Sequence, residues 1–89
     1  MTTPETVVLR LPQEACSSVI GSLWAVSASL SGDERTGLLR VAAQVHIALC
    51  RSLEVNPLAS LDLLFVLPED LRRQFADQVT SQVRLRRGP

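Results

Sequence analysis

An apolar run between two prolines constrains this chain more than any other feature. The run extends from Leu58 to Leu67, and only Ser60 and Asp62 within it are polar. Pro57 precedes it and Pro68 follows it, and proline in a helix is tolerated only in the first turn. A helix that is apolar on nearly every side has to be covered by other helices or by a second chain.

The run therefore predicts a short third helix that lies in the interior. We expect Leu61, Leu64 and Phe65 to be core residues, and any face of this helix that stays open to bind a second chain. The length of 89 residues points the same way. A single domain of this size buries only about two-thirds of its unfolded surface, so oligomerisation would enlarge a thin core.

Three other segments space their apolar residues by three and four positions, which is typical of amphipathic helices. They run from Pro12 to about Leu30, from about Asp33 to Leu53, and onward from Pro68. The middle segment is the most broadly apolar, so we expect it to be central. A row of small residues on the first helix would either admit another helix closely or face solvent: Ser18, Ser22, Ala25 and Ser29.

The start of the second of these helices carries its own signal. Ser31 and Glu34 match the S-x-x-E capping box, in which each side chain bonds a backbone amide of the other's residue. Together these segments predict a mainly α fold: a small four-helix bundle-like domain over residues 1–89, preceded by one N-terminal β-strand or extended arm. We expect residues 1–5 and 86–89 to be flexible.

The expected strand lies between Thr6 and Leu11, where apolar side chains alternate and β-branched residues are frequent. A lone strand leaves its backbone donors and acceptors unpaired. It is therefore either an arm packed on the helices or a strand that pairs with its copy in another protomer. The second possibility predicts a dimer interface that includes Val7 and Leu9, besides Leu61, Leu64 and Phe65.

The chain contains no residue pattern that is typical of a catalytic or metal site. His46 is the single histidine, and Cys50 follows it by four residues, so the two share a helix face. A nucleophile and base would also need an orienting group and a cradle for an oxyanion. We interpret Cys16 and Cys50 as buried, reduced thiols. We therefore expect no enzyme, no cofactor and no metal.

Charge and composition indicate where such a chain works. Nine basic and nine acidic residues cancel, which argues against a general attraction to nucleic acid or to an anionic membrane. All nine basic residues are arginine, which suggests a GC-rich bacterial or phage genome. The start, Met-Thr-Thr-Pro-Glu, lacks the features of a signal peptide, and no stretch is apolar enough to span a bilayer. We expect a cytoplasmic protein.

These observations favour a non-enzymatic, homo-oligomeric helical module that binds another protein or regulates through contact, most simply as a dimer. The alternative is DNA binding. The sequence Thr6-Val-Val-Leu-Arg-Leu-Pro-Gln-Glu14, followed by a helix, a turn and a helix up to about residue 50, resembles the ribbon-helix-helix regulators. In that family the N-terminal strands of a dimer pair and enter the major groove. The resemblance implies that Thr6 and Arg10 face DNA.

A third hypothesis concerns the arginines near the end of the chain. Arg84, Arg86 and Arg87, together with Arg72 and Arg73, could contact the phosphates of RNA or DNA. Because no aromatic residue lies nearby for stacking and the net charge is zero, a solvated helix end is the favoured explanation of these arginines. Nucleic acid is thus a weaker expectation than a protein partner.

Overall fold

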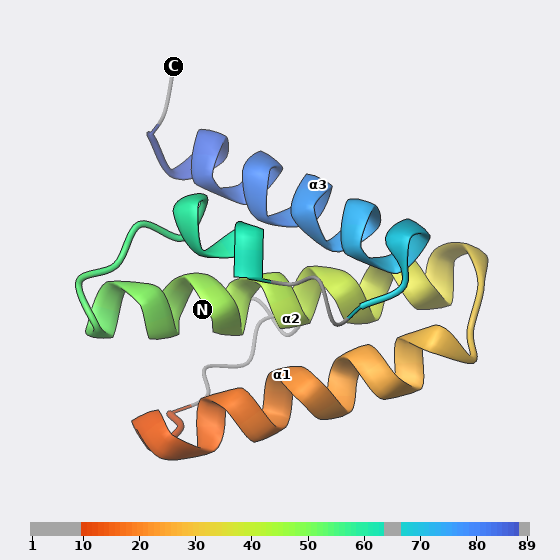
Figure 1. Cartoon of the computed structure of the whole chain (residues 1–89), viewed down its shortest axis with the longest axis horizontal. Helices are drawn as coiled ribbons and strands as arrows, with labels where there is room; N and C mark the ends of the chain where they lie inside the picture. Colours follow the sequence, from red (N-terminus) through yellow and green to blue (C-terminus); the bar gives the residue numbers. More distant parts are fainter. Residues whose placement is uncertain (1–9, 64–66, 88–89) are drawn as a thin grey trace, which may run out of the picture.

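Helix α2 (Gly32–Ser52) is the centre of the fold, with α1 (Gln13–Ala28) on one side and α3 (Glu69–Arg87) on the other (Figure 1). The computed structural model describes residues 10–63 and 67–87, and these ranges hold three α-helices, one short 3-10 helix and no strand. Helices α1 and α2 run antiparallel through a short connection, and α3 crosses the far side of α2. The prediction of a mainly α fold with a central second helix is confirmed.

The expected third α-helix is wrong in kind. In the described part of the interval between the two prolines, residues 58–63 and 67, the structure has a 3-10 helix of five residues, η1 (Ala59–Leu63), in place of an α-helix. The Asn56 side chain accepts a hydrogen bond from the Leu58 amide at 2.9 Å, and this Asx turn starts the segment. So few residues between two prolines cannot repay the cost of nucleating an α-helix, and the shorter i to i+3 bonds suffice.

The interior forms where α2 meets α3. A central cluster of buried residues comes from these two helices: Leu39, Ala42, Ala43, Ile47, Leu71, Phe75 and Val79. The ring of Trp24, from α1, meets the fully buried ring of Phe75 edge-on, with centroids 5.3 Å apart. Leu61, which was predicted to be a core residue, is partly buried and packs against this cluster. Leu64 and Phe65 lie outside the described residues.

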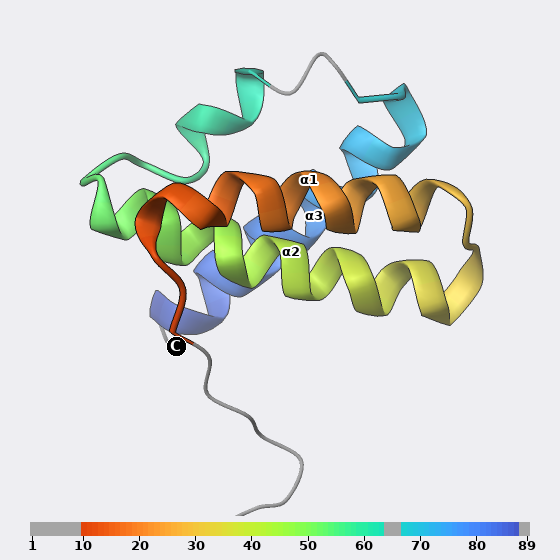
Figure 2. The same ribbon diagram turned by 90° about the horizontal axis from the view of Figure 1, so that it is seen from below.

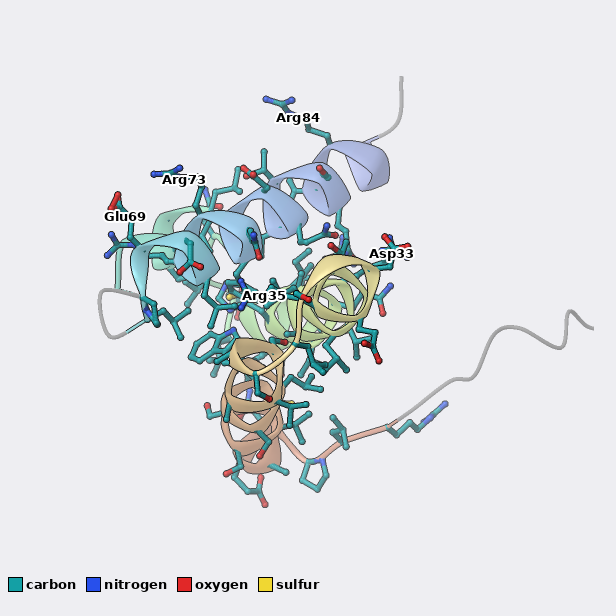
Figure 3. All side chains as sticks on the ribbon, turned by 90° about the vertical axis from the view of Figure 1, so that its right-hand side faces the viewer. Asp33, Arg35, Glu69, Arg73 and Arg84 are labelled. Atoms are coloured by element: carbon teal, nitrogen blue, oxygen red, sulfur yellow. The ribbon has the colours of Figure 1, made fainter. Side chains whose placement is uncertain are left out.

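Arg35, near the start of α2, joins the ends of all three helices. Its Nε donates to the carbonyls of Ser27 and Leu30 at 3.0 and 2.9 Å, and its Nη2 donates to that of Ala28. Its Nη1 lies 3.4 Å from the Asp70 carboxylate, at the start of α3. Figure 3 shows Arg35 in the angle between the helices. One guanidinium thus satisfies carbonyls that the end of α1 leaves open.

The predicted capping box at the start of α2 is wrong. Ser31 precedes the helix, yet its side chain makes no capping hydrogen bond. Gly32 takes a φ of +61°, a left-handed conformation in place of the helical one that a capping box requires at this position. The acidic residues Asp33 and Glu34 still lie in the first turn, where they complement the helix dipole.

Helix α2 ends in a Schellman motif that turns the chain back toward η1. The amide of Val55 donates to the carbonyl of Cys50 at 2.8 Å, and the amide of Glu54 donates to that of Arg51 at 3.1 Å. Glu54 takes the left-handed conformation at the residue after the cap, with a φ of 58°. This reversal carries the segment 57–61 back along α2.

Candidate functional site

A groove lies between the start of α1 and the outer face of α2. Its volume is about 520 Å³. Among the described residues, its apolar lining comes from Leu11, Val41, Val45, Ala48 and Leu49, together with the buried Cys16. Arg10, Gln13, Gln44 and Ser52 add polar groups, and Gln13 Nε2 donates to Ser52 Oγ at 2.8 Å, which ties α1 to the end of α2.

The groove leaves large apolar surface in contact with solvent. Val41 is 41% exposed and Leu11 is 39% exposed, although both lie beside other aliphatic side chains. Figure 2 shows that the chain leading into α1 and the segment containing η1 lie on opposite sides of the α1–α2 pair. The groove is therefore on the side that η1 does not cover.

The sequence-predicted interface residues are only partly within the described ranges. Val7 and Leu9 lie outside them, as do Leu64 and Phe65, and Leu61 packs against the core on the opposite side of α2. The sequence predicted only that the second helix as a whole is central, and did not single out Val41 or Val45, so it missed the groove. Their spacing to Ala48 and Ser52 was a usable signal, because these residues share one helix face.

His46 lies at the centre of a small polar cluster on that opposite side. Its Nε2 is 3.0 Å from Ser60 Oγ, 3.3 Å from the Pro57 carbonyl oxygen and 3.6 Å from Cys50 Sγ. Ser60 Oγ in turn donates to the Pro57 carbonyl at 3.0 Å. The ring of His46 also meets Phe75 edge-on, with centroids 5.5 Å apart. Burial lowers the pKa of His46, and the hydrogen bond to Pro57 opposes this shift.

The directions of the hydrogen bonds in this cluster are those of a structural contact, called the latch below, and not those of a nucleophile with its base. The Pro57 oxygen can only accept, so we assign the proton of the neutral ring to Nε2, which donates to Pro57 and Ser60. A base would need that nitrogen free to take a proton from Ser60 or Cys50. These hydrogen bonds join the segment 57–61 to α2.

Both cysteines are free and buried, which confirms the interpretation of reduced thiols. Cys16 Sγ lies 3.5 Å from the Pro12 carbonyl oxygen, and Cys50 belongs to the His46 cluster. Among the residues that the structure describes, no three His, Cys, Asp or Glu side chains gather in a way that could hold a metal ion.

The described arginines of α3, Arg72, Arg73 and Arg84, do not form one patch. Figure 3 shows Glu69 and Arg73 at one end of the helix and Arg84 at the other. Arg72 and Arg84 are twelve residues apart, which amounts to about 18 Å along a helix. Arg73 pairs with Glu69 at 3.3 Å. The side chains of Arg86 and Arg87 lie outside the described set, so phosphate binding by the chain end stays a prediction.

The DNA-binding hypothesis likewise stays a prediction. Thr6 and the expected strand fall largely outside the described residues, and Arg10 is exposed at the rim of the groove.

The small-residue row of α1 faces solvent within this chain: Ser18, Ser22, Ala25 and Ser29 are all exposed.

Comparisons with known proteins give no relative from which a function for the groove could be inferred. In the described ranges, none of the helices has the length and apolar character needed to cross a membrane. No protein-family model matches the chain, and no curated protein or solved structure matches it either.

Proposed function

We propose that this chain is a non-enzymatic protein–protein interaction module that forms a homodimer through the groove between α1 and α2, and that it regulates through such contacts. The observation that carries the proposal is the exposure of Val41, 41% of whose surface is open beside the aliphatic side chains of the groove. Contiguous apolar surface of this kind marks interaction sites on small proteins.

The groove has the anatomy of a protein interface. Its floor is aliphatic, with Val45 and Leu49 half-buried beside the exposed Val41. Gln13, Gln44 and Ser52 supply hydrogen-bonding groups around this floor. An apolar centre with a polar rim is the usual arrangement of binding surfaces, because the centre loses water and the rim keeps it.

A second copy of the chain fits the charge of this surface. In a two-fold dimer the same patch faces itself, so any charge on it meets a like charge. Among the described residues that line the groove, only Arg10 is charged, and it lies in the chain before α1. The whole chain has a formal net charge of zero, so general repulsion between copies is absent.

Sedimentation or light scattering over a range of concentrations tests the proposal. Val41→Lys brings two ammonium groups into the dimer interface, and we expect the dissociation constant to rise by about 100-fold or more, as for a central contact. Val26→Lys is the matched control, because Val26 is 50% exposed on α1 and does not line the groove.

The control variant should dimerise like the unaltered chain. A chain that stays monomeric at high micromolar concentration, or a Val41→Lys variant that dimerises normally, would show that the groove is not a dimer interface. Circular dichroism of both variants separates loss of dimer from loss of fold.

A further inference from the structure

We infer that the element of the second copy that packs on this site is its helix α2, which lies antiparallel along α2 of the first copy. This inference rests on the proposed function, because it names which part of the partner binds. Three observations support it: an uncovered face of α2, a glycine in that face with open space around it, and the distribution of charge along the helix.

One face of α2 has no helix over it in the described part of the chain. Figure 3 looks along α2, with α1 below it and α3 above it to the left, and shows no described helix on the right, where Asp33 lies. The residues of this face recur every three or four positions: Gly37, Val41, Gln44, Val45, Ala48 and Ser52. All of them except Gly37 line the groove, so the uncovered face and the groove form one surface.

Gly37 lies inside α2, where glycine destabilises a helix relative to alanine. A Cβ atom added at this position would meet no atom within 4 Å. No contact within the described chain therefore requires the absence of a side chain here. The close approach of a second backbone does require it, and a helix packed on this face supplies such a backbone.

The uncovered face is complementary to itself when two copies of α2 run antiparallel. The face extends from Gly37 to Ser52, about 22 Å of helix, and its centre lies just after Gln44. With the two-fold axis at this centre, Val41 lies opposite Ala48 of the second copy, so that a larger side chain meets a smaller one. The two Gln44 amides meet near the axis, where each can donate to the other and accept from it.

Charge favours the antiparallel arrangement over the parallel one. The first turn of α2 carries Asp33 and Glu34, and its last turn carries Arg51. A parallel pair would place each of these residues beside its own copy, so like charges would meet. The antiparallel pair instead brings Arg51 of each copy within about one turn of the acidic first turn of the other. Arg40 lies near an arginine of the second copy in either arrangement and does not decide between them.

Two matched glycine replacements in the full-length chain test whether a helix covers this face. Gly37→Leu should raise the dimer dissociation constant about tenfold or more, because leucine holds the two helices apart although it favours α2 itself. Gly21→Leu is the control, since Gly21 also lies in a helix, its added Cβ also meets nothing within 4 Å, and it does not line the groove. The control should change the constant by less than about threefold. Sedimentation over a range of concentrations measures both, and circular dichroism checks that both variants stay helical.

Cross-linking tests the antiparallel register. A Val41→Cys chain mixed with an Ala48→Cys chain should give a heterodimer with a short thiol-specific cross-linker, because the two positions face each other. Either chain alone should give much less product, since equivalent positions are then offset by about 10 Å along the pair. The native thiols Cys16 and Cys50 are buried and contribute only background.

The other outcomes separate failure of this inference from failure of the proposed function. A dimer that is lost in Val41→Lys but unchanged in Gly37→Leu would leave the groove as the interface and show that its occupant is not α2. Cross-linking of each single-cysteine chain to itself, with no gain on mixing, would show a parallel pair and also overturn the inference. Failure of the unaltered chain to dimerise would remove the proposed function itself.

Discussion

The two opposite sides of α2 differ in what covers them, although both are apolar. One side, which includes Leu39, Ala43 and Cys50, is buried beneath α3 and the segment 57–61. The other, which includes Val41 and Val45, forms the open groove. Val41 and Cys50 are nine residues apart, or half a turn beyond two full turns. The hydrophobicity of a helix face therefore does not tell whether the cover comes from the same chain or from another.

The largest effect is expected from a matched pair of truncations on the two sides. Ile47, on the covered side, is 1% exposed, and Ile47→Ala should lower the free energy of unfolding by about 2 to 4 kcal/mol through lost transfer energy and a cavity. Val41→Ala should change it by less than about 0.5 kcal/mol, since alanine is also the better helix former. Urea unfolding followed by Trp24 fluorescence, at concentrations below dimerisation, measures both.

A large loss in Val41→Ala under those conditions would contradict the comparison. It would mean that the groove is filled within a single chain, because truncating an uncovered side chain leaves no cavity. A small loss in Ile47→Ala would mean that the covered side relaxes around the missing atoms.

Much of the fold could be predicted because it depends on local periodicity. The apolar spacing after Pro68 predicted α3, and the buried residues Leu71, Phe75 and Val79 follow that spacing at intervals of four. The prediction of a capping box was wrong because the backbone of Gly32, and not the side chain of Ser31, determines how the chain enters α2. The prediction of a third α-helix was wrong because an apolar run between prolines does not distinguish an α-helix from a 3-10 helix.

A smaller loss of unfolding free energy is expected when the contacts that Arg35 makes with the end of α1 are removed. Arg35 is 19% exposed and bonds three carbonyls at the end of α1, so Arg35→Ala should cost about 1.5 to 3 kcal/mol of unfolding free energy. Arg35→Lys keeps the charge but loses the planar fork and should recover little.

Asp70→Asn tests whether the ion pair or the carbonyl contacts matter. The Asp70 side chain is 70% exposed, so its pair with Arg35 should contribute less than about 1 kcal/mol. An Asp70→Asn variant as unstable as Arg35→Ala would mean that the attraction between α2 and α3 is the main contribution. Thermal or urea unfolding of the three variants decides this.

The candidate site was harder to predict than the fold because it depends on contacts between distant residues. Sequence spacing placed His46 beside Cys50, but the partner that holds its ring, Ser60, is fourteen residues away. The groove arises because α3 and η1 both pack on the other side of α2, which no local pattern records. The role of Arg35 likewise depends on where α1 ends, and the spacing of residues in the sequence does not predict that role.

The smallest expected effect is a pH dependence that belongs to the covered side alone. Burial lowers the pKa of His46 in the folded chain, so the unfolded chain binds the additional proton first as pH falls. The stabilisation is fully present above about pH 6.5, the ordinary value for histidine, and is lost as pH falls through the folded pKa. The slope can reach at most about 1.4 kcal/mol per pH unit.

His46→Gln is the variant that isolates this effect, because its amide can still donate toward Pro57 but does not titrate. The difference in unfolding free energy between the two proteins should shift against the unaltered chain between pH 7 and pH 5, since the carboxylates common to both cancel. A constant difference over this range would mean that His46 keeps its ordinary pKa and that the latch is open to water. A change of opposite sign would mean that the Pro57 carbonyl stabilises the imidazolium more than burial opposes it, and that the segment 57–61 is held more tightly in acid.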